Sequence, residues 1–489
     1  MSYTYLTKLI TNILTRFKDS YALDTRALSL MRIGIGIILM IDLFIRSLSI
    51  RAFFTNEGIL PTDILKAYNW NPYYFSFHAL SGELWWQIIL FLVNAVCIAL
   101  LIIGFRARLF TFICWVFLVS LQNRNPFILQ GGDDLLRMML LWGIFLPWGE
   151  RYSIYKKESV YPDRYFSLAG IGYLLLVCSV YFFSALLKTD AEWHSEGTAL
   201  YYALSLDQLR LPAGTLLYNF PALLKPLTWV VYYIELLAPV LIILPFVSYK
   251  VRLCGVLLIT LLHVGIAFTL YVGLFYIIGL VTLIGLLPES IMNRFDLKYI
   301  KHPVLVHPDE NHRNSSFILY TAHALKAWMV ALIICYCLLL NLGNVKKFPY
   351  VLDPAMIKFG NALRLEQSWG MFSPSVLKDD GFFVYSGYTT SGKFIDILRQ
   401  GKEVSYLKPA NVVSEFESDR WRKFSENYVF NNNNYMRPYY CKYLIRKWNT
   451  DHPENRITDL SIFFMKEISL PDYKTKPLEK NAVCNCQDI

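Results

Sequence analysis

The sequence predicts a polytopic α-helical membrane protein with about nine spans and a small extracytoplasmic α+β domain at its C-terminus. Of the 489 residues, 55% are hydrophobic and only 17% are charged, and the mean hydropathy is +0.37. Apolar runs of membrane-spanning length recur throughout residues 1–343. The composition then turns polar, so residues 344–489 are expected to form a separate domain outside the membrane. These properties exclude an ordinary soluble globule and a disordered chain.

The nine expected spans are apolar runs that would each form a helix, because lipid offers no partner to the backbone polar groups. They cover 28–48, 84–103, 109–121, 134–148, 167–187, 228–247, 253–272, 274–288 and 325–343. The short runs 109–121 and 134–148 could extend into their flanks or be partly re-entrant. Residues 1–20 carry basic side chains among leucine and isoleucine and no cleavage site. They are expected to form an amphipathic helix on the cytoplasmic membrane surface.

Basic residues fall in alternate connections between these runs, and the positive-inside rule places such connections in the cytoplasm. They are Arg106, Arg108, Arg151, Lys156, Lys157, Arg164, Lys250, Arg252, Arg294, Lys298, Lys301, Arg313 and Lys326. The N-terminus is expected on the same side. Arg46 and Arg51 go against the rule, but Asp42 offers Arg46 an ion-pair partner four residues earlier on the helix. The segments expected outside are 49–83, 122–133, 188–227 and the tail after 344.

The tail shows local signals for both strands and helices. The runs 382–385 and 394–397 flank a Thr-Ser-Gly-Lys turn, which predicts a β-hairpin. A helix is expected over 435–448 and a strand over 460–468. The tail also contains Cys441, Cys484 and Cys486, and two of these three could pair if the tail faces an oxidising compartment.

Several function classes lack their sequence signals. The net charge of +10 lies mostly in short segments between apolar runs, so no nucleic acid is expected as a partner. No phosphate-binding loop, dinucleotide-binding loop, serine nucleophile elbow, zinc spacing or haem signature is present, so neither a nucleotide nor a metal cofactor is expected. A substrate reached through the lipid bilayer, such as a quinone or a lipid, stays open.

Lys188 lies where the apolar run 167–187 meets an acidic and aromatic segment. Desolvation lowers the pKa of an amine, and a neutral amine at a membrane face can act as a general base. Position alone favours a plainer interpretation, in which the lysine reaches water and anchors the helix. Asp190 and Glu192 would raise its pKa unless they are engaged elsewhere.

Ionisable side chains inside apolar runs are costly and therefore call for an explanation. They are Arg32, Asp42, Arg46, Arg137, Glu235 and His263. The first three are predicted to form a buried charge network that locks helix packing. Glu235 could pair with Arg137 across the bundle. His263 could exchange a proton near neutral pH or serve as a hydrogen-bonded core residue.

The segment 122–134 interrupts two apolar runs with polar side chains and paired glycines. Such a segment could enter the outer leaflet if it lines a cavity. Asp133 and Asp134 could orient a polar substrate group or hold Lys188. On the residues alone, an ordinary loop with an aspartate at a helix N-terminus is favoured.

Six segments carry a resemblance to a known family. They are the opening with Arg26, Arg32-Ile33-Gly34 and Asp42, then 53–61, Gly104-Phe105-Arg106-Ala107-Arg108, Asn123-Arg124-Asn125-Pro126, Gly131-Gly132-Asp133-Asp134 and, more weakly, the stretch 367–374. They resemble the horizontally transferred transmembrane (HTTM) domain family, which includes the vitamin K-dependent gamma-carboxylases and many bacterial proteins. The resemblance spans roughly residues 22–295 and implies a bacterial inner-membrane protein.

The resemblance also implies site residues. The segment 188–193 is similar to the one that holds the catalytic lysine of the carboxylases, and the helix around His263 resembles the one that carries a second important histidine. Lys188 would then deprotonate a reduced, vitamin K-like quinone, and His263 would assist. In the carboxylases, oxygen turns the quinol into a strong base that takes a glutamate γ-proton, carbon dioxide traps the carbanion, and an epoxide leaves. Substrate-binding roles are expected for Asn123, Arg124, Asn125, Asp133, Asp134, Asp190 and Trp193.

The chain departs from the family in two places. The carboxylases have an Asn-His pair where this sequence reads Arg124-Asn125, so one catalytic histidine is missing. The tail is also shorter than the luminal domain that holds the propeptide in the carboxylases. The resemblance therefore implies quinol oxygenation more strongly than glutamate carboxylation. One alternative is a non-catalytic scaffold that helps to mature or export a peptide. A small-molecule carrier is less favoured, because no inverted repeat or pair of broken helices is visible.

Overall fold

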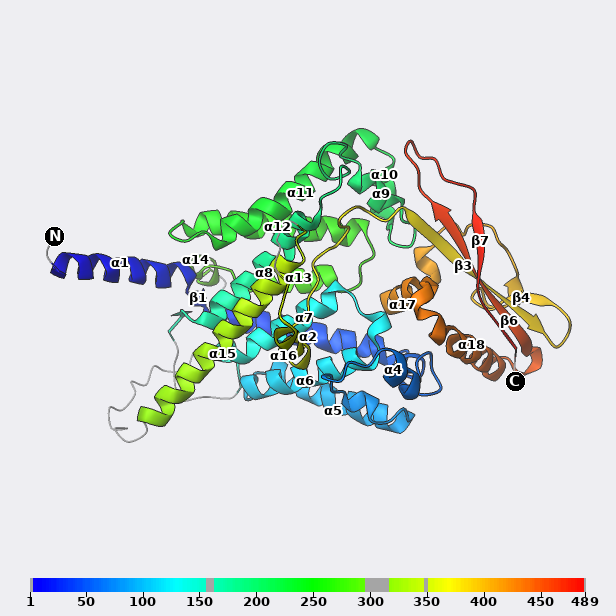
Figure 1. Ribbon diagram of the computed structural model, residues 1–489, viewed down its shortest axis with the longest axis horizontal. Helices are drawn as coiled ribbons and strands as arrows, with labels where there is room; N and C mark the ends of the chain where they lie inside the picture. The colour runs from blue at the N-terminus through cyan, green and yellow to red at the C-terminus, as the bar shows by residue number, and fades with distance from the viewer. Residues whose placement is uncertain (1–2, 155–161, 295–315, 347–350, 488–489) are drawn as a thin grey trace.

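A helical bundle with a sheet domain at one end makes up the structure, a computed structural model that describes residues 3–154, 162–294, 316–346 and 351–487 (Figure 1). The helices before the tail are α1 (Tyr3–Tyr21), α2 (Thr25–Ser47), α3 (Ile50–Phe54), α4 (Thr62–Tyr68), α5 (Leu84–Ile102), α6 (Ala107–Arg124), α7 (Gly131–Phe145), α8 (Leu168–Leu187), α9 (Ala199–Ser205), α10 (Pro212–Tyr218), α11 (Pro221–Ile243), α12 (Tyr249–Thr269), α13 (Phe275–Ile284), α14 (Glu289–Met292) and α15 (Ser316–Gly343). Short 3₁₀ turns η1 (Phe77–Ala79) and η2 (Pro126–Ile128) and the strand pair β1 (Leu23–Asp24) and β2 (Arg164–Tyr165) join them.

Six helices of the described residues are long and apolar enough to cross a membrane, which supports the multi-pass class. They are Thr25–Ser47, Leu84–Ile102, Leu168–Leu187, Pro221–Ile243, Tyr249–Thr269 and Ala324–Gly343. The other three expected runs also form helices, α6, α7 and α13, which are shorter than these six. The α13 helix has only 10 residues, about 15 Å of rise, and α7 carries two aspartates in its first turn.

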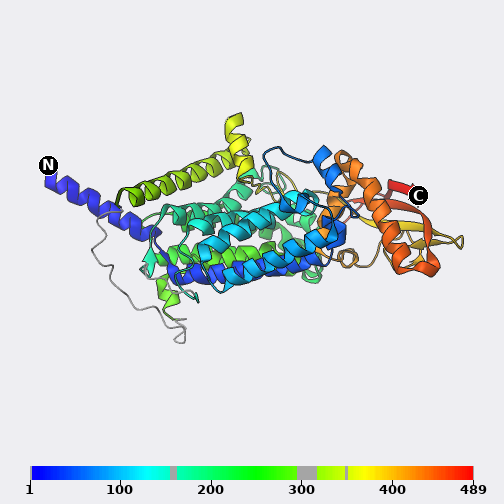
Figure 2. The same ribbon diagram turned by 90° about the horizontal axis from the view of Figure 1, so that it is seen from below.

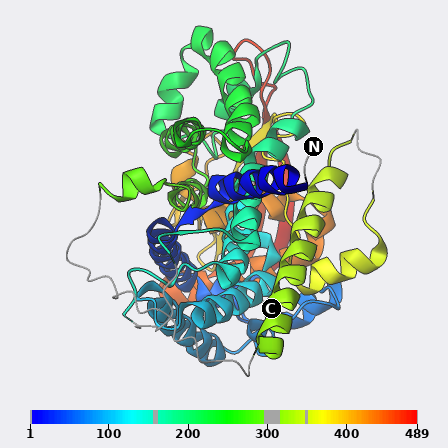
Figure 3. The ribbon, with the colours of Figure 1, turned by 90° about the vertical axis from the view of Figure 1, so that its left-hand side faces the viewer.

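The α8 helix is the centre of the bundle. In its membrane-length window, 72% of the residues are buried, against 28% in α11 and 22% in the last span. Helices α11 and α12 lie on one side of the bundle and α5 and α6 on the opposite side (Figures 1 and 3). The α1 helix projects from the end opposite the tail (Figure 2), with Leu9, Ile10, Ile13 and Leu14 exposed.

The connections between the helices lie at the two ends of the bundle. At the tail end, Trp421 Nε1 donates to Ser49 Oγ over 3.0 Å, and the Tyr201 hydroxyl donates to the Leu470 carbonyl over 2.6 Å. At the other end, Arg252 donates to the Ser20 carbonyl over 2.6 Å. The segments expected on one side therefore meet at one end. Of the basic residues used for that expectation, Lys156, Lys157, Lys298, Lys301 and Arg313 lie outside the described residues.

The tail forms an antiparallel sheet in the order β5-β4-β3-β6-β7 with helices on one face. Strands β3 and β4 confirm the predicted hairpin, and α18 and β6 confirm the expected helix and strand. Helices α17 and α18 lie between this sheet and the bundle (Figure 1). Cys441 on α18 forms a disulfide with Cys486 on β7. The elements are β3 (Asp379–Thr389), β4 (Phe394–Asp396), β5 (Lys402–Glu403), η3 (Val413–Glu415), α17 (Asp419–Val429), η4 (Asn431–Met436), α18 (Arg437–Asp451), η5 (Pro453–Asn455), β6 (Ile457–Ile468) and β7 (Glu479–Gln487).

The first part of the tail packs on the bundle instead of on the sheet. It consists of α16 (Pro354–Ala362) and a segment that we call the strap, residues 369–376. Trp369 is 1% exposed and belongs to the same apolar core as the bundle helices. The strap thus folds back over the end of the bundle where α8 ends.

Candidate functional site

Lys188 directly follows the last residue of α8 and is buried, with 2% of its side chain exposed. One turn earlier on the same helix face lies Ser184, whose Oγ accepts a hydrogen bond from the Lys188 Nζ over 2.9 Å. The Nζ also lies 4.5 Å from the centre of the Trp193 ring and forms an ion pair with the Glu235 carboxylate. The lysine is therefore enclosed by protein, so it does not reach water as an anchor would.

Glu235 reaches Lys188 from α11, which packs along α8. The expected pairing of Glu235 with Arg137 is therefore wrong. Arg137 is bound by Asp134 at 2.8 Å, by the Gln122 side chain at 2.5 Å, and by the carbonyl oxygen of Arg364 at 2.8 Å. The folded-back segment before the strap thus supplies two of the acceptors for Arg137, the carbonyl oxygens of Arg364 and Glu366. In the sequence, the only sign that Glu235 has a functional or structural role was its ionisable side chain within the apolar run of α11.

His263 on α12 is fully buried and lies 2.6 Å from the Tyr181 hydroxyl through its Nε2. Among the described residues its Nδ1 has no hydrogen-bond partner. Tyr181, Ser184 and Lys188 are spaced by three and four residues, so they share one face of α8. Tyr181 and Lys188 are separated by about 10 Å of helix rise. Lys188 therefore lies at the C-terminal end of this face of α8, and His263 contacts the same face nearer the N-terminus, at Tyr181.

The acidic residues next to Lys188 do not form ion pairs with it. Asp190 is exposed, and its backbone N–H donates to the Pro374 carbonyl over 3.3 Å. Glu192 is buried and pairs with Lys378 at 2.7 Å. Burial lowers the pKa of Lys188 below its usual range, and the Glu235 carboxylate acts in the opposite direction.

The strap covers the segment that follows Lys188. Trp193 Nε1 donates to the Phe372 carbonyl over 3.0 Å, and the Val376 backbone N–H donates to the Glu192 carboxylate over 3.1 Å. Trp369 lies in the apolar core of the bundle and Met371 packs against that core, whereas Phe372 packs against the cluster that contains Trp193 and Pro374 is exposed.

Asn123, Arg124 and Asn125 bind backbone carbonyls of the α3 and η1 region. Asn123 Nδ2 donates to Phe75 at 2.8 Å, Arg124 to Thr55 at 3.3 Å, and Asn125 Nδ2 to Phe53 at 3.0 Å. These contacts position α6 against the chain that follows α2.

Arg124 is nevertheless not satisfied by its surroundings. It is fully buried, and in the described part of the chain its Nε and one of its Nη atoms have no hydrogen-bond partner. Burial, reinforced by Arg124 and Arg46, lowers the pKa of His78 on η1 to about 3. A buried guanidinium with free donors beside a neutral histidine is suited to bind an acidic or polar oxygen.

Asp133 belongs to a buried network of four charges and does not hold Lys188. It pairs with Arg46 at 2.5 Å and with Arg420 at 2.5 Å. Asp42 pairs with the same two arginines at 2.7 Å each. This four-charge network confirms the predicted Asp42–Arg46 pair and extends it to α17 of the tail, which sequence reasoning did not foresee. Arg32 stands apart from it and donates to the Trp148 carbonyl over 3.0 Å.

No family model, curated protein or solved structure matches this chain.

Proposed function

We propose that this chain is a membrane enzyme that oxygenates a reduced quinone of the vitamin K type, with Lys188 as its base. The observation that carries the proposal is the buried contact of Lys188 with Glu235, Ser184 and Trp193. Holding an isolated ammonium ion in such a place costs several kcal/mol, on the order of the Born penalty after relaxation. A lysine that served only as an anchor would not need to be buried.

The pair of Lys188 and Glu235 provides a route to a neutral amine. When the shared proton lies on Glu235, both groups are neutral, which surroundings of low polarity favour. The free electron pair of Nζ would then accept the hydroxyl proton of a bound quinol. For the substrate, one oxygen atom of O₂ would add across the ring double bond, and the other would leave as water with the two quinol hydrogens. Carboxylation of a glutamate would be a further step, and the oxygenation of the quinol does not require it.

One group beside the base fits the binding of such a substrate, since the Trp193 ring offers an aromatic face next to Lys188. Arg124, whose donors lack partners among the described residues, lies by Thr55 in another part of the bundle. Tyr181 and His263 would serve as a hydrogen-bonding pair on the same face of α8.

We also propose nine membrane crossings, in which α6, α7 and α13 complete the six longer helices. The N-terminus would lie in the cytoplasm of a bacterial cell and the tail outside it. The meeting of 49–83, 122–133 and 188–227 with the tail at one end of the bundle supports this arrangement.

A non-catalytic scaffold is the second candidate, and a cavity in the tail domain favours it. The cavity has a volume of about 220 Å³ and lies between β3 and the helices α17 and α18. Its lining is largely aromatic and includes Phe382, Tyr385, Phe416, Trp421, Tyr440 and Trp448. Such a cavity would hold an apolar side chain of a peptide that the protein helps to mature or export.

The decisive experiment is an oxygen-uptake assay on the purified protein in lipid nanodiscs supplied with reduced naphthoquinones. The proposal expects oxygen consumption and an equal amount of quinone epoxide by mass spectrometry. If no reduced naphthoquinone is turned over, the enzyme proposal should be abandoned for the scaffold, and peptide binding to the tail cavity should be measured instead.

A further inference from the structure

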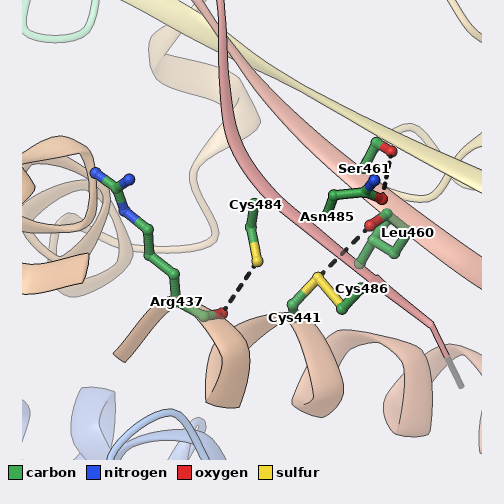
Figure 4. The surroundings of a disulfide bond; sticks show 7 residues. All are labelled: Arg437, Cys441, Leu460, Ser461, Cys484, Asn485 and Cys486. Carbon is green, nitrogen blue, oxygen red and sulfur yellow. Dashed lines mark hydrogen bonds between the residues drawn. A yellow bond between two sulfur atoms is a disulfide. The ribbon is translucent and has the colours of Figure 1, made fainter. Parts of the chain in front are cut away.

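Three cysteines of the tail lie together where α18 crosses β7 (Figure 4). Cys441 is on α18, and Cys484 and Cys486 are two residues apart on β7, so they point to the same face of the sheet. In the register with β6, Ile462 pairs with Cys484 and Leu460 with Cys486, and the pairing shifts just beside Cys484, between Ile462 and Phe463. All three sulfur atoms lie within 4.8 Å of one another.

Two of these cysteines are bonded and the third lies beside them as a thiol. The disulfide joins Cys441 to Cys486, whose Cα atoms are 6.4 Å apart. Cys484 donates a weak hydrogen bond from its thiol to the Arg437 carbonyl over 3.5 Å. The Cys441 sulfur lies 3.7 Å from the Leu460 carbonyl, but this is only a contact because a disulfide sulfur carries no proton.

We propose that the tail domain contains an internal thiol–disulfide exchange site, in which Cys441 changes partner between Cys486 and Cys484. The Cys484 thiolate attacks the Cys441 sulfur, the bond to Cys486 breaks, and Cys486 leaves as a thiolate. That thiolate takes up the proton that Cys484 released. The number of disulfide bonds and of thiols is unchanged, so the step needs no oxidant or reductant.

Burial decides which sulfur takes part in which reaction. Cys441 is fully buried, whereas Cys484 and Cys486 are half-buried, so a thiol from solution meets only the two strand cysteines. A bond between Cys484 and Cys486 would join residues about 6.7 Å apart along one strand, at the upper end of the usual Cα separation for disulfides. Cys441 is thus the constant partner, and a free strand cysteine is the one that reacts with an external thiol or disulfide.

The reactivity of Cys484 is set by its surroundings. Burial raises the pKa of the Cys484 thiol, while Tyr428 from α17 and Arg437 from α18 act in the opposite direction. Because only the thiolate attacks, exchange is expected to be faster in alkaline solution than at neutral pH.

The test is disulfide mapping of the full-length protein by mass spectrometry under non-reducing conditions. Wild-type protein is held at about pH 9 without reductant, where thiolates are common, then acidified and alkylated. A peptide that links Cys441 to Cys484, with Cys486 alkylated, is the expected result. A Cys484→Ser control should contain only the bond between Cys441 and Cys486.

A Cys486→Ser variant provides the second measurement. Purified with oxidised glutathione as the two-electron oxidant, the folded variant should form the bond between Cys441 and Cys484. Folded protein in which Cys441 and Cys484 both stay alkylatable would overturn the proposal. If the variant does not fold, the wild-type map decides alone, and the absence of the linked peptide overturns the proposal. Wild-type protein isolated with three thiols around a bound zinc or copper ion would overturn it as well.

Discussion

Lys188 and Glu235 depend on each other for charge compensation. In the described part of the chain, each is the only ion-pair partner of the other. Truncating one member of a buried pair leaves an uncompensated charge and costs about 3–5 kcal/mol. A test of the base should therefore keep the positive charge, so that the loss of chemistry is not confused with the loss of folding.

Replacing Lys188 with arginine separates the two interpretations of this residue. The guanidinium keeps its charge and cannot give up its proton at any working pH. We expect the fold to be kept and quinol-dependent oxygen uptake to fall by about 10²–10⁴, the usual worth of a general base. Lys225→Arg is the matched control, since Lys225 is an exposed lysine over the Trp229 ring. Unchanged turnover in Lys188→Arg would return Lys188 to a structural role.

A second residue-scale prediction concerns Asp380, which is buried on β3 and accepts a hydrogen bond from the Asp207 backbone N–H. Burial, followed by the nearby Asp207 charge, raises the pKa of Asp380 to about 7, while Lys408 acts in the opposite direction. The folded state therefore binds this proton more tightly than the unfolded chain. The stability that it contributes is full below about pH 4 and is lost as the pH rises through about 7.

We expect the free energy of unfolding to decrease between about pH 4 and pH 7, by roughly 4 kcal/mol at most. Denaturant unfolding of the purified protein across this range measures the slope. Asp380→Asn should flatten it, because an amide does not titrate. Asp379→Asn should leave it unchanged, since Asp379 is largely exposed and pairs with Lys466. An unaltered slope in Asp380→Asn would assign the pH dependence to another group.

Among the elements, α17 links the two halves of the molecule. Its Arg420 reaches both aspartates of the four-charge network and also donates to the Ile128 carbonyl of η2 over 2.8 Å. Its planar, forked guanidinium has five N–H donors in a fixed geometry, which lets one side chain serve these three acceptors. The attachment of the tail to the bundle therefore depends strongly on one side chain.

Arg420→Met should loosen the tail without unfolding the bundle. The loss leaves an excess of negative charge on Asp42 and Asp133, at a cost of about 3–5 kcal/mol. Limited proteolysis should then release the tail faster than from wild-type protein. Lys423→Met, on the same helix but half-buried and paired only with Glu426, is the control and should behave as wild type. Equal proteolysis of all three proteins would show that the other contacts, such as Trp421 with Ser49 and Tyr201 with Leu470, hold the tail without Arg420.

Local elements were predictable and distant partners were not. The β3–β4 hairpin and α18 follow from turn residues and periodicity, and the Asp42–Arg46 pair follows from its spacing of four. Glu235 meets Lys188 only because α11 packs on α8, and Arg420 is 378 residues from Asp42. Such contacts depend on how helices pack, which periodicity does not specify. The number of membrane spans was also hard to predict, because α6, α7 and α13 are short or carry polar residues at their ends.

For the whole molecule, the projecting α1 helix and the tail occupy opposite ends (Figures 1 and 2). We therefore expect a reporter that is active only in the cytoplasm to be silent when fused after residue 489 and active when fused before residue 1. Fluorescence or enzyme activity of the two fusions in whole cells measures this. A strong signal from the C-terminal fusion would contradict the proposed orientation and place Lys188 at the cytoplasmic face.

The four-charge network also has a consequence for the order of synthesis. Asp42 and Arg46 leave the ribosome together and enter the bilayer as a neutral pair. Asp133 then adds a negative charge, and Arg420 follows only 287 residues later. At roughly 5–20 residues per second, the nascent bundle carries this unbalanced carboxylate for about 15–60 s. A chain that stops before α17 therefore lacks the second positive charge of the network permanently.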